Sequence, residues 1–152
     1  MNKAFIVICV LTFVACASQK AAKPNTAEGN TRTKKVAYIN DNTYLLTKYS
    51  VDSTYGYTAA NAVKVGGVKE SSGPKNEQRF LNALLGPNGE PTKYFRKGSC
   101  CGFKTPNGIL GGGLLDLYRV YWRGCTDTLN IYINMYDEGN LEVPVGLTAK
   151  TK

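Results

Sequence analysis

The chain has 152 residues, a formal net charge of +8 and no histidine. Without an imidazole it lacks the usual general base of Ser-His-Asp and Cys-His hydrolases and the commonest ligand of a zinc hydrolase site. We accordingly predict no catalytic residue, no metal site and no cofactor.

The first fifteen residues have the pattern of a bacterial lipoprotein signal peptide. Lys3 gives a short positive start, and Ala4 to Ala15 form an apolar run that is shorter than the ~20 residues a membrane helix needs. The tetrapeptide Phe13-Val14-Ala15-Cys16 resembles the lipobox, whose cysteine receives a diacylglycerol thioether. We therefore predict that lipid on Cys16 anchors the mature chain in the membrane. The alternative is an ordinary signal peptide that is cleaved elsewhere.

The segment after Cys16 is polar and basic. Ala17 to Lys35 contain no Leu, Ile, Val, Met or aromatic residue, and five basic residues stand against one acid. Such a segment cannot bury enough apolar surface to order itself. We expect residues 16–35 to form a lipidated, disordered tether with an r.m.s. span of roughly 25 Å, either solvated or resting on anionic head groups. Residues 36–152 are then one domain. For an exported basic chain we expect anionic lipid or polysaccharide surfaces, and no nucleic acid, as counterparts.

The domain is predicted to begin with two strands, Tyr44 to Val51 and the shorter Val63 to Val65. Gly73-Pro74 then opens the one predicted helix, which Gly86-Pro87 ends. Its apolar stripe consists of Phe80, Leu81, Leu84 and Leu85. Its opposite face consists of Lys75, Gln78, Arg79 and Asn82, which are either simply solvated or take part in binding.

The second half of the domain is predicted to hold most of the sheet. After a turn at Pro87 to Pro91, Lys93 to Lys97 form a strand and residues 98–113 a long loop. Leu115 to Arg123 and Thr128 to Tyr136 alternate with a clean period of two, and their short connection predicts an antiparallel hairpin. The predicted fold class is α+β, a small antiparallel sheet with one packed helix.

Three cysteines lie in the predicted domain, Cys100, Cys101 and Cys125. Export makes a disulfide from Cys125 to Cys100 or Cys101 one interpretation, and free buried thiols another. A third is a reactive thiol at Cys100 or Cys101, whose thiolate the nearby Lys97 and Lys104 would favour.

An anion or ligand site is predicted at the start of the helix, where unpaired N–H groups meet Lys75 and Asn76, with Lys104 as a further candidate. The run Gly111-Gly112-Gly113 lacks the spacing of a phosphate-binding loop and predicts a flexible loop or tight turn.

Three segments, GGVKESSGPKNEQRFLNALLGPNGEP, GSCCGFKTPNG and YINMYDEGNLEVPVGLT, follow one another along the chain. On them the chain resembles small envelope lipoproteins common in the Bacteroidota, over roughly Gly56 to Thr148. Some members carry the name of a 2-dehydro-3-deoxyphosphooctonate aldolase. We do not expect that activity, because such an aldolase is a TIM barrel of about 250 residues, whereas 137 residues with one predicted helix follow Ala15 here. The resemblance implies a location and not a reaction.

The same resemblance bears on the position in the envelope. Acidic residues directly after the lipidated cysteine resemble a surface-export signal in that lineage, and Ala17 to Lys20 contain none. We therefore expect the outer membrane, with the domain facing the periplasm. The tripeptides that contain Ser53 and Thr128 resemble the lineage's short O-glycosylation sequon, which makes these residues candidate glycosylation sites.

Together these features predict an anchored, non-enzymatic module that binds a protein or glycan of the envelope, or has a structural role there. Outward tyrosines on the last two strands would suit recognition, unless they pack in the core. The alternative is a small enzyme or ligand-binding protein that uses the segment Cys100–Gly113 with Lys75 or Lys104. A stress or assembly factor of the envelope fits the same sequence features.

Overall fold

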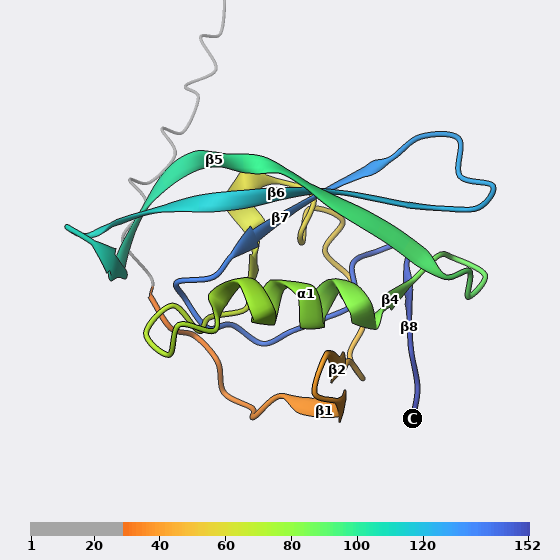
Figure 1. Ribbon diagram of the computed structural model, residues 1–152, viewed down its shortest axis with the longest axis horizontal. Coiled ribbons are helices and arrows are strands. Elements are labelled where there is room, and N and C mark those ends of the chain that lie inside the picture. The colour runs from red at the N-terminus through yellow and green to blue at the C-terminus, as the bar shows by residue number, and fades with distance from the viewer. Residues whose placement is uncertain (1–28) are drawn as a thin grey trace, which may run out of the picture.

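The computed structural model describes residues 29–152, so the expected signal peptide, Cys16 and the first part of the expected tether lie outside the described residues. The predicted α+β class is confirmed, with one α-helix packed against a mostly antiparallel sheet (Figure 1). No helix in residues 29–152 is long and apolar enough to cross a membrane. The elements are β1 (Ala37–Asn40), β2 (Thr43–Leu45), the 3-10 helix η1 (Ala59–Asn61), β3 (Val63–Lys64), α1 (Gly73–Ala83), β4 (Leu84–Leu85), β5 (Thr92–Ile109), β6 (Gly112–Trp122), β7 (Leu129–Asn134) and β8 (Thr148–Ala149).

The main sheet has four strands in the order β3–β7–β6–β5. β6 and β7 form the predicted antiparallel hairpin, in which Tyr118 lies opposite Ile131 and Val120 opposite Leu129. The short strand predicted around Val63 is confirmed as β3, which pairs parallel with β7. β5 pairs antiparallel with the other side of β6 and forms one edge of the sheet.

The loop predicted for residues 98–113 is wrong. β5 runs 18 residues to Ile109, and only Leu110 and Gly111 separate it from β6. Strand pairing survives in this glycine-rich segment because the register shifts at three places, one of them between Cys100 and Gly102. Such bulges bend a strand without ending its pairing. The strand predicted at Lys93 to Lys97 is therefore one part of a much longer hairpin arm.

The first predicted strand is shorter than expected. Only Thr43–Leu45 pair, with β1, as a small separate sheet. Farther along the predicted segment, Tyr49 makes an isolated bridge with Val143. The imperfect alternation of this segment thus corresponds to a strand followed by irregular chain.

The helix α1 lies with its apolar stripe against the main sheet. It begins at Gly73 with Pro74 in its first turn, as predicted, and ends at Ala83, after which Leu84 and Leu85 pair with β8 as β4. Phe80 and Leu81 are almost completely buried. Each such side chain contributes roughly 1.5–3 kcal/mol on burial. The helix shares its core with Val63, Val65, Val120, Ile131, Ile133 and Val143.

The polar face of α1 is covered only in part: Lys75 and Gln78 are exposed, whereas Arg79 and Asn82 contact the β1–β2 hairpin. Arg79 Nε donates a hydrogen bond to the carbonyl of Asp41 over 2.8 Å, and Asn82 Nδ2 donates to the carbonyl of Asn42 over the same distance. These bonds hold the β1–β2 hairpin against the helix. Figure 1 shows the result, with α1 between the main sheet and this hairpin.

The described end of the expected tether is bound to the domain. The backbone N–H groups of Thr31 and Arg32 both donate to the carbonyl of Glu138, and Thr33 N–H donates to the Asn140 side chain. The predicted boundary at residue 36 is therefore too late within the described chain. Polar side chains and backbone, not apolar burial, order this segment, which explains why its composition indicated disorder.

Candidate functional site

A polar cleft of about 370 Å³ lies where the N-terminal segment, the β1–β2 hairpin and the start of α1 meet. The elements bring together side chains that are far apart in the sequence. The cations Arg32, Lys35 and Arg79, the rings of Tyr38 and Tyr44, the amide of Asn76, and the carboxylates of Glu70 and Glu138 line this polar cleft.

Arg79 forms one wall of the polar cleft. Its guanidinium carbon lies 5.2 Å from the centre of the Tyr38 ring, a cation–π contact, and its Nη1 donates to Asn76 Oδ1 over 2.8 Å. Burial raises the pKa of Tyr44 to about 12, so its hydroxyl stays protonated and can donate at neutral pH. The wall therefore places the Tyr38 ring beside the positive charge of Arg79.

Arg32 fixes the opposite side of the polar cleft. Its Nε donates to the carbonyl of Gly139 and its Nη2 to that of Val65, each over 2.9 Å. Nη1 lies 3.4 Å from Glu138 Oε1. Because three different carbonyl or carboxylate groups hold this side chain, its positive charge is kept in one position.

The three residues predicted for the anion site do not lie together. Asn76 lines the polar cleft, but its Nδ2 donates to the carbonyl of Gly66 over 3.1 Å and its oxygen accepts from Arg79. Lys75 is exposed and lies 4.0 Å from an Asp41 oxygen. Lys104 lies on β5 and lines a different concavity. One of the three predicted residues therefore lines the cleft. Arg79 beside it belongs to the helix face that was expected to be either solvated or binding, whereas Arg32 was expected only in the tether.

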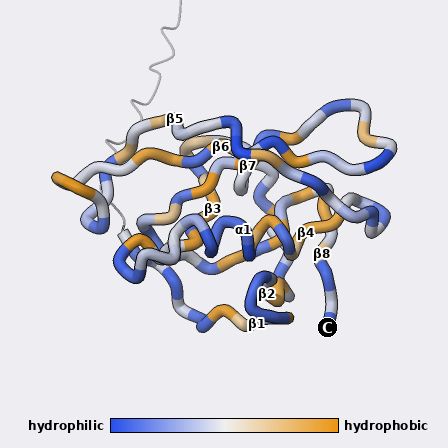
Figure 2. Tube along the Cα trace, in the orientation of Figure 1, coloured by the Kyte–Doolittle hydropathy of each residue, from blue (hydrophilic) through white to orange (hydrophobic). Residues whose placement is uncertain are grey.

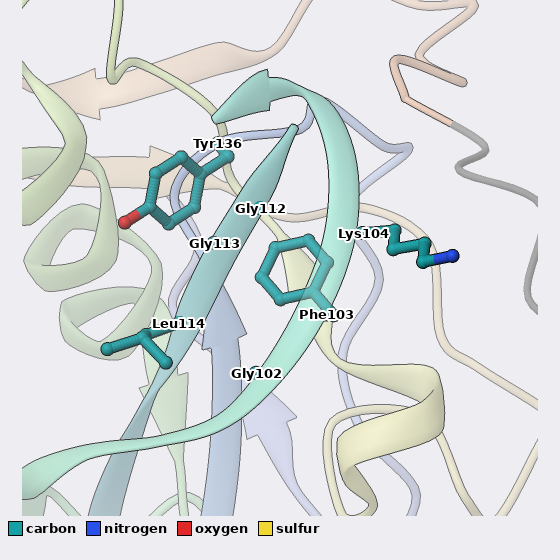
Figure 3. Close-up of a pocket in the computed structure, with 7 residues that line it drawn as sticks. All are labelled: Gly102, Phe103, Lys104, Gly112, Gly113, Leu114 and Tyr136. Atoms are coloured by element: carbon teal, nitrogen blue, oxygen red, sulfur yellow. The ribbon is translucent and has the colours of Figure 1, made fainter. Parts of the chain in front are cut away.

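The second concavity is a shallow apolar depression of about 530 Å³ at the far end of the β5–β6 hairpin (Figure 3). Phe103 and Tyr136 meet edge to face there, with ring centres 5.9 Å apart. Gly113 lies beneath them, and a Cβ at this position would be 2.9 Å from Tyr136 ring atoms and 3.0 Å from Phe103. The depression is lined by Gly102, Phe103, Lys104, Gly112, Gly113, Leu114 and Tyr136.

The three described cysteines are free. The predicted disulfide is wrong for geometric reasons. Cys100 lies opposite Leu115, whereas Cys125 follows Trp122, which pairs with Thr92 at the other end of the strands. The separation is on the order of 25 Å along the strand, far beyond the span of a disulfide. Burial also raises the pKa of the Cys100 thiol to about 11, which at this residue is contrary to the third interpretation, a reactive thiolate at Cys100 or Cys101.

A buried pair of carboxyl groups joins α1 to the sheet. Glu77 is completely buried, and its Oε2 accepts from the Tyr118 hydroxyl over 2.8 Å, while Oε1 has no partner. Burial raises the pKa of Glu77 to about 8; the bond from Tyr118 opposes this rise and the neighbouring Asp116 charge adds to it. Arg96 holds Asp116 with two bonds of 2.7 Å.

This pair is closed to a substrate by the burial of Glu77, so its role is structural. The pair was not predicted from the sequence, although the sequence contains a signal for it. Glu77 precedes Phe80, Leu81 and Leu84 by three, four and seven residues, which places it within the apolar stripe. A carboxyl group at such a position indicates a buried polar interaction.

The candidate glycosylation residues lie in different surroundings. Ser53 is exposed in a turn that follows Asp52, and Thr128 is half-buried directly before β7. The tyrosines that were expected to face outward on the last two strands also differ in burial. Tyr118 is in the core, whereas Tyr132 and Tyr136 are half-buried on the opposite face of the sheet.

Among the described residues, no cluster of three or more cysteine, aspartate or glutamate side chains could hold a metal ion. No known protein family matches the chain, and neither a curated protein nor a solved structure is significantly similar to it. The resemblance to envelope lipoproteins therefore stays a prediction.

Proposed function

We propose that the protein is an envelope lipoprotein, anchored in the outer membrane through lipid on Cys16, whose periplasmic domain is a non-enzymatic module that binds an anionic glycan. The support for the anchor is the apolar run that stops at Cys16. The support for binding is the polar cleft, which three cationic side chains line and where one of them, Arg79, lies over the Tyr38 ring.

The chemistry of the polar cleft suits a sugar that bears a carboxylate or phosphate. The positive charges of Arg32, Lys35 and Arg79 at the cleft attract such an anion. Tyr38 is 44% exposed, which leaves ring surface for an apolar sugar face. The carboxylates Glu70 and Glu138 at the same cleft can accept bonds from sugar hydroxyls. The protonated Cys100 thiol lends no support to the alternative of a small enzyme.

The anchor is tested by the intact mass of the protein extracted from native membranes. We expect a chain that begins at Cys16 and carries acyl mass. A Cys16→Ser variant should be absent from washed membranes. A chain cut elsewhere and free of lipid would contradict the proposed anchor.

Binding is tested on an array of neutral and uronic-acid-bearing oligosaccharides. We expect acidic sugars to bind, and Lys35→Glu to weaken binding roughly three- to ten-fold because it reverses one charge at the cleft. Lys93→Glu is the matched control, since Lys93 is also exposed but lies on β5, outside the cleft. Equal loss in both variants, or equal binding of neutral sugars, would contradict a site in the cleft. Binding of an acidic protein but of no sugar would replace the glycan by a protein partner.

A further inference from the structure

The tip of the β5–β6 hairpin is apolar and exposed. Ile109 is 84% exposed and Leu110 is fully exposed. Figure 2 shows that the free end of the β5–β6 hairpin is hydrophobic and projects to one side of the domain. A single exposed apolar side chain is ordinary, but two adjacent ones at a protruding turn form a surface that water solvates poorly.

The backbone at this tip does not favour leucine. Leu110 has φ 53° and Gly111 has φ 76°, so both central residues of the turn are left-handed, as in a type I′ turn. Asparagine, aspartate or glycine is preferred at the first of these positions, because a Cβ-bearing residue without a short polar side chain is strained there. A leucine at this place is explained by an interaction of its side chain, and the described chain provides none.

The tip is held firmly to the domain. Thr105 and Asp137 are both buried and hydrogen bonded to each other. Asp137 also accepts from Asn107 Nδ2 over 2.8 Å and from Asn134 Nδ2 over 3.0 Å. The turn therefore projects from a base that these hydrogen bonds hold in place.

The chain reaches the domain at this same tip. Asn107 Nδ2 donates to Asn30 Oδ1 over 2.8 Å, and Gly29 is buried against Pro106. Gly29 follows Cys16 by only thirteen positions. A chain of thirteen residues with random-coil dimensions would span about 20 Å. A lipid on Cys16 would thus keep the tip beside the bilayer at high effective concentration. This step rests on the proposed anchor.

The surroundings of the tip match an interfacial membrane contact. Leu114 is half-exposed, and Lys104 points away from Leu114 and Tyr136 in Figure 3. Lys104 is itself exposed. Apolar side chains with a basic residue beside them bind at the boundary between acyl chains and head groups, where the cation meets lipid phosphates.

We propose that Ile109 and Leu110 insert into the interfacial layer of the bilayer that carries the anchor, with Lys104 at its head groups. The partner is thus a phospholipid surface, which the hairpin tip contacts directly. The contact sets the orientation of the domain on the membrane, since the rigid hairpin meets the bilayer end-on.

The experiment places a tryptophan at the tip of the acylated full-length protein, as Ile109→Trp, in phosphatidylethanolamine–phosphatidylglycerol vesicles with brominated acyl chains. Val51→Trp is the matched control, because Val51 is 100% exposed and lies outside the hairpin. The native Trp122 gives the same background in both variants, at the opposite end of the strand pair. We expect the indole introduced at position 109 to be quenched and shifted to shorter wavelength, and that at position 51 to be unaffected.

The outcomes separate the insertion from the anchor. Protein that floats with the vesicles but shows no quenching at position 109, or equal quenching at both positions, would overturn insertion and leave the anchor intact. If the protein carries no acyl mass, the proposed anchor is wrong. Insertion of the tip is then tested by adding the same brominated vesicles to the unacylated chain. Quenching confined to position 109 would then still support insertion, and its absence would overturn it. Lys104→Glu should reduce the quenching, whereas Lys93→Glu should not.

Discussion

Glu77 and Leu110 differ in burial, and each lies in the environment that its side chain usually avoids. The carboxyl group of Glu77 is completely buried between α1 and the sheet, while Leu110 is completely exposed at the hairpin tip. A buried ionisable group is tolerated when it is neutral or paired, and Glu77 meets this requirement through a raised pKa and the Tyr118 hydroxyl.

The difference lies in where the compensation is found. Glu77 is compensated within the chain, by burial of a neutral form and one hydrogen bond. Leu110 has no such compensation in the described residues, and its left-handed backbone adds strain. A side chain in an unfavourable environment that finds a partner within the chain, as Glu77 does, indicates a structural role. One that finds no partner within the described chain, as Leu110 does, indicates contact with another molecule or surface.

The largest expected effect concerns Glu77 and the dependence of the free energy of unfolding on pH. The folded pKa of Glu77, about 8, lies above its ordinary value of 4.5, so the folded state holds the proton more tightly. The resulting stability is fully present below about pH 4.5 and is lost as pH rises through 8. Between these values the free energy of unfolding should fall by roughly 3–5 kcal/mol through this group.

Urea unfolding from pH 5 to 9 measures this loss. Glu77→Gln removes the titrating group while keeping the acceptor for Tyr118, so its stability should be nearly independent of pH in this range. The exposed Glu70→Gln is the control and should keep the dependence of the parent protein. An equally steep fall in Glu77→Gln would show that another group causes it.

A smaller effect is expected at the base of the hairpin end. Gly113→Ala places a methyl group within 3.0 Å of both aromatic rings above it, so we expect a loss of about 1–3 kcal/mol. Gly102→Ala in the same depression is the control, because its Cβ would meet only a Leu114 carbon at 3.8 Å. The melting temperatures of the two variants test this, and we expect that of Gly113→Ala to be the lower. Equal melting temperatures would mean that the rings move aside freely.

The smallest expected effect has the opposite sign and lies at the tip. Leu110→Asn supplies a residue that accepts the left-handed backbone, so the free energy of unfolding should rise by about 0.5–1 kcal/mol. Urea unfolding of the soluble variant measures this gain. Val51→Asn, at an exposed residue outside the hairpin, should give none. A less stable Leu110→Asn variant would show that leucine is favoured there by the fold itself.

Sequence periodicity predicted those parts of the fold whose residues alternate regularly. The helix around Phe80 and the β6–β7 hairpin follow from apolar spacing that local geometry imposes. β5 was missed beyond Lys97 because its Gly, Ser and Cys residues have little strand preference and are held by pairing with β6.

Most of the polar cleft could not be predicted, because it too depends on contacts between residues that are far apart in the sequence. Its start-of-helix residue Asn76 was predicted, because a helix terminus is a local feature. Arg32 enters through bonds to residues 33 and 107 positions away along the chain, which no local pattern indicates. The segment that carries Arg32 was predicted as tether, since its order depends entirely on those distant partners.

The length of β5 has a consequence for reach. Because Lys104 and Ile109 both pair with Gly112, the arm is as long as the 11 residues of β6 and spans on the order of 35 Å, from the turn at Leu110 to Thr92 beside the connection that contains Cys125. With the turn at the bilayer, the strand pair would act as a rigid spacer that presents the β6–β7 connection well above the lipid head groups. Partners too bulky to approach the membrane closely could meet the protein at that distal end.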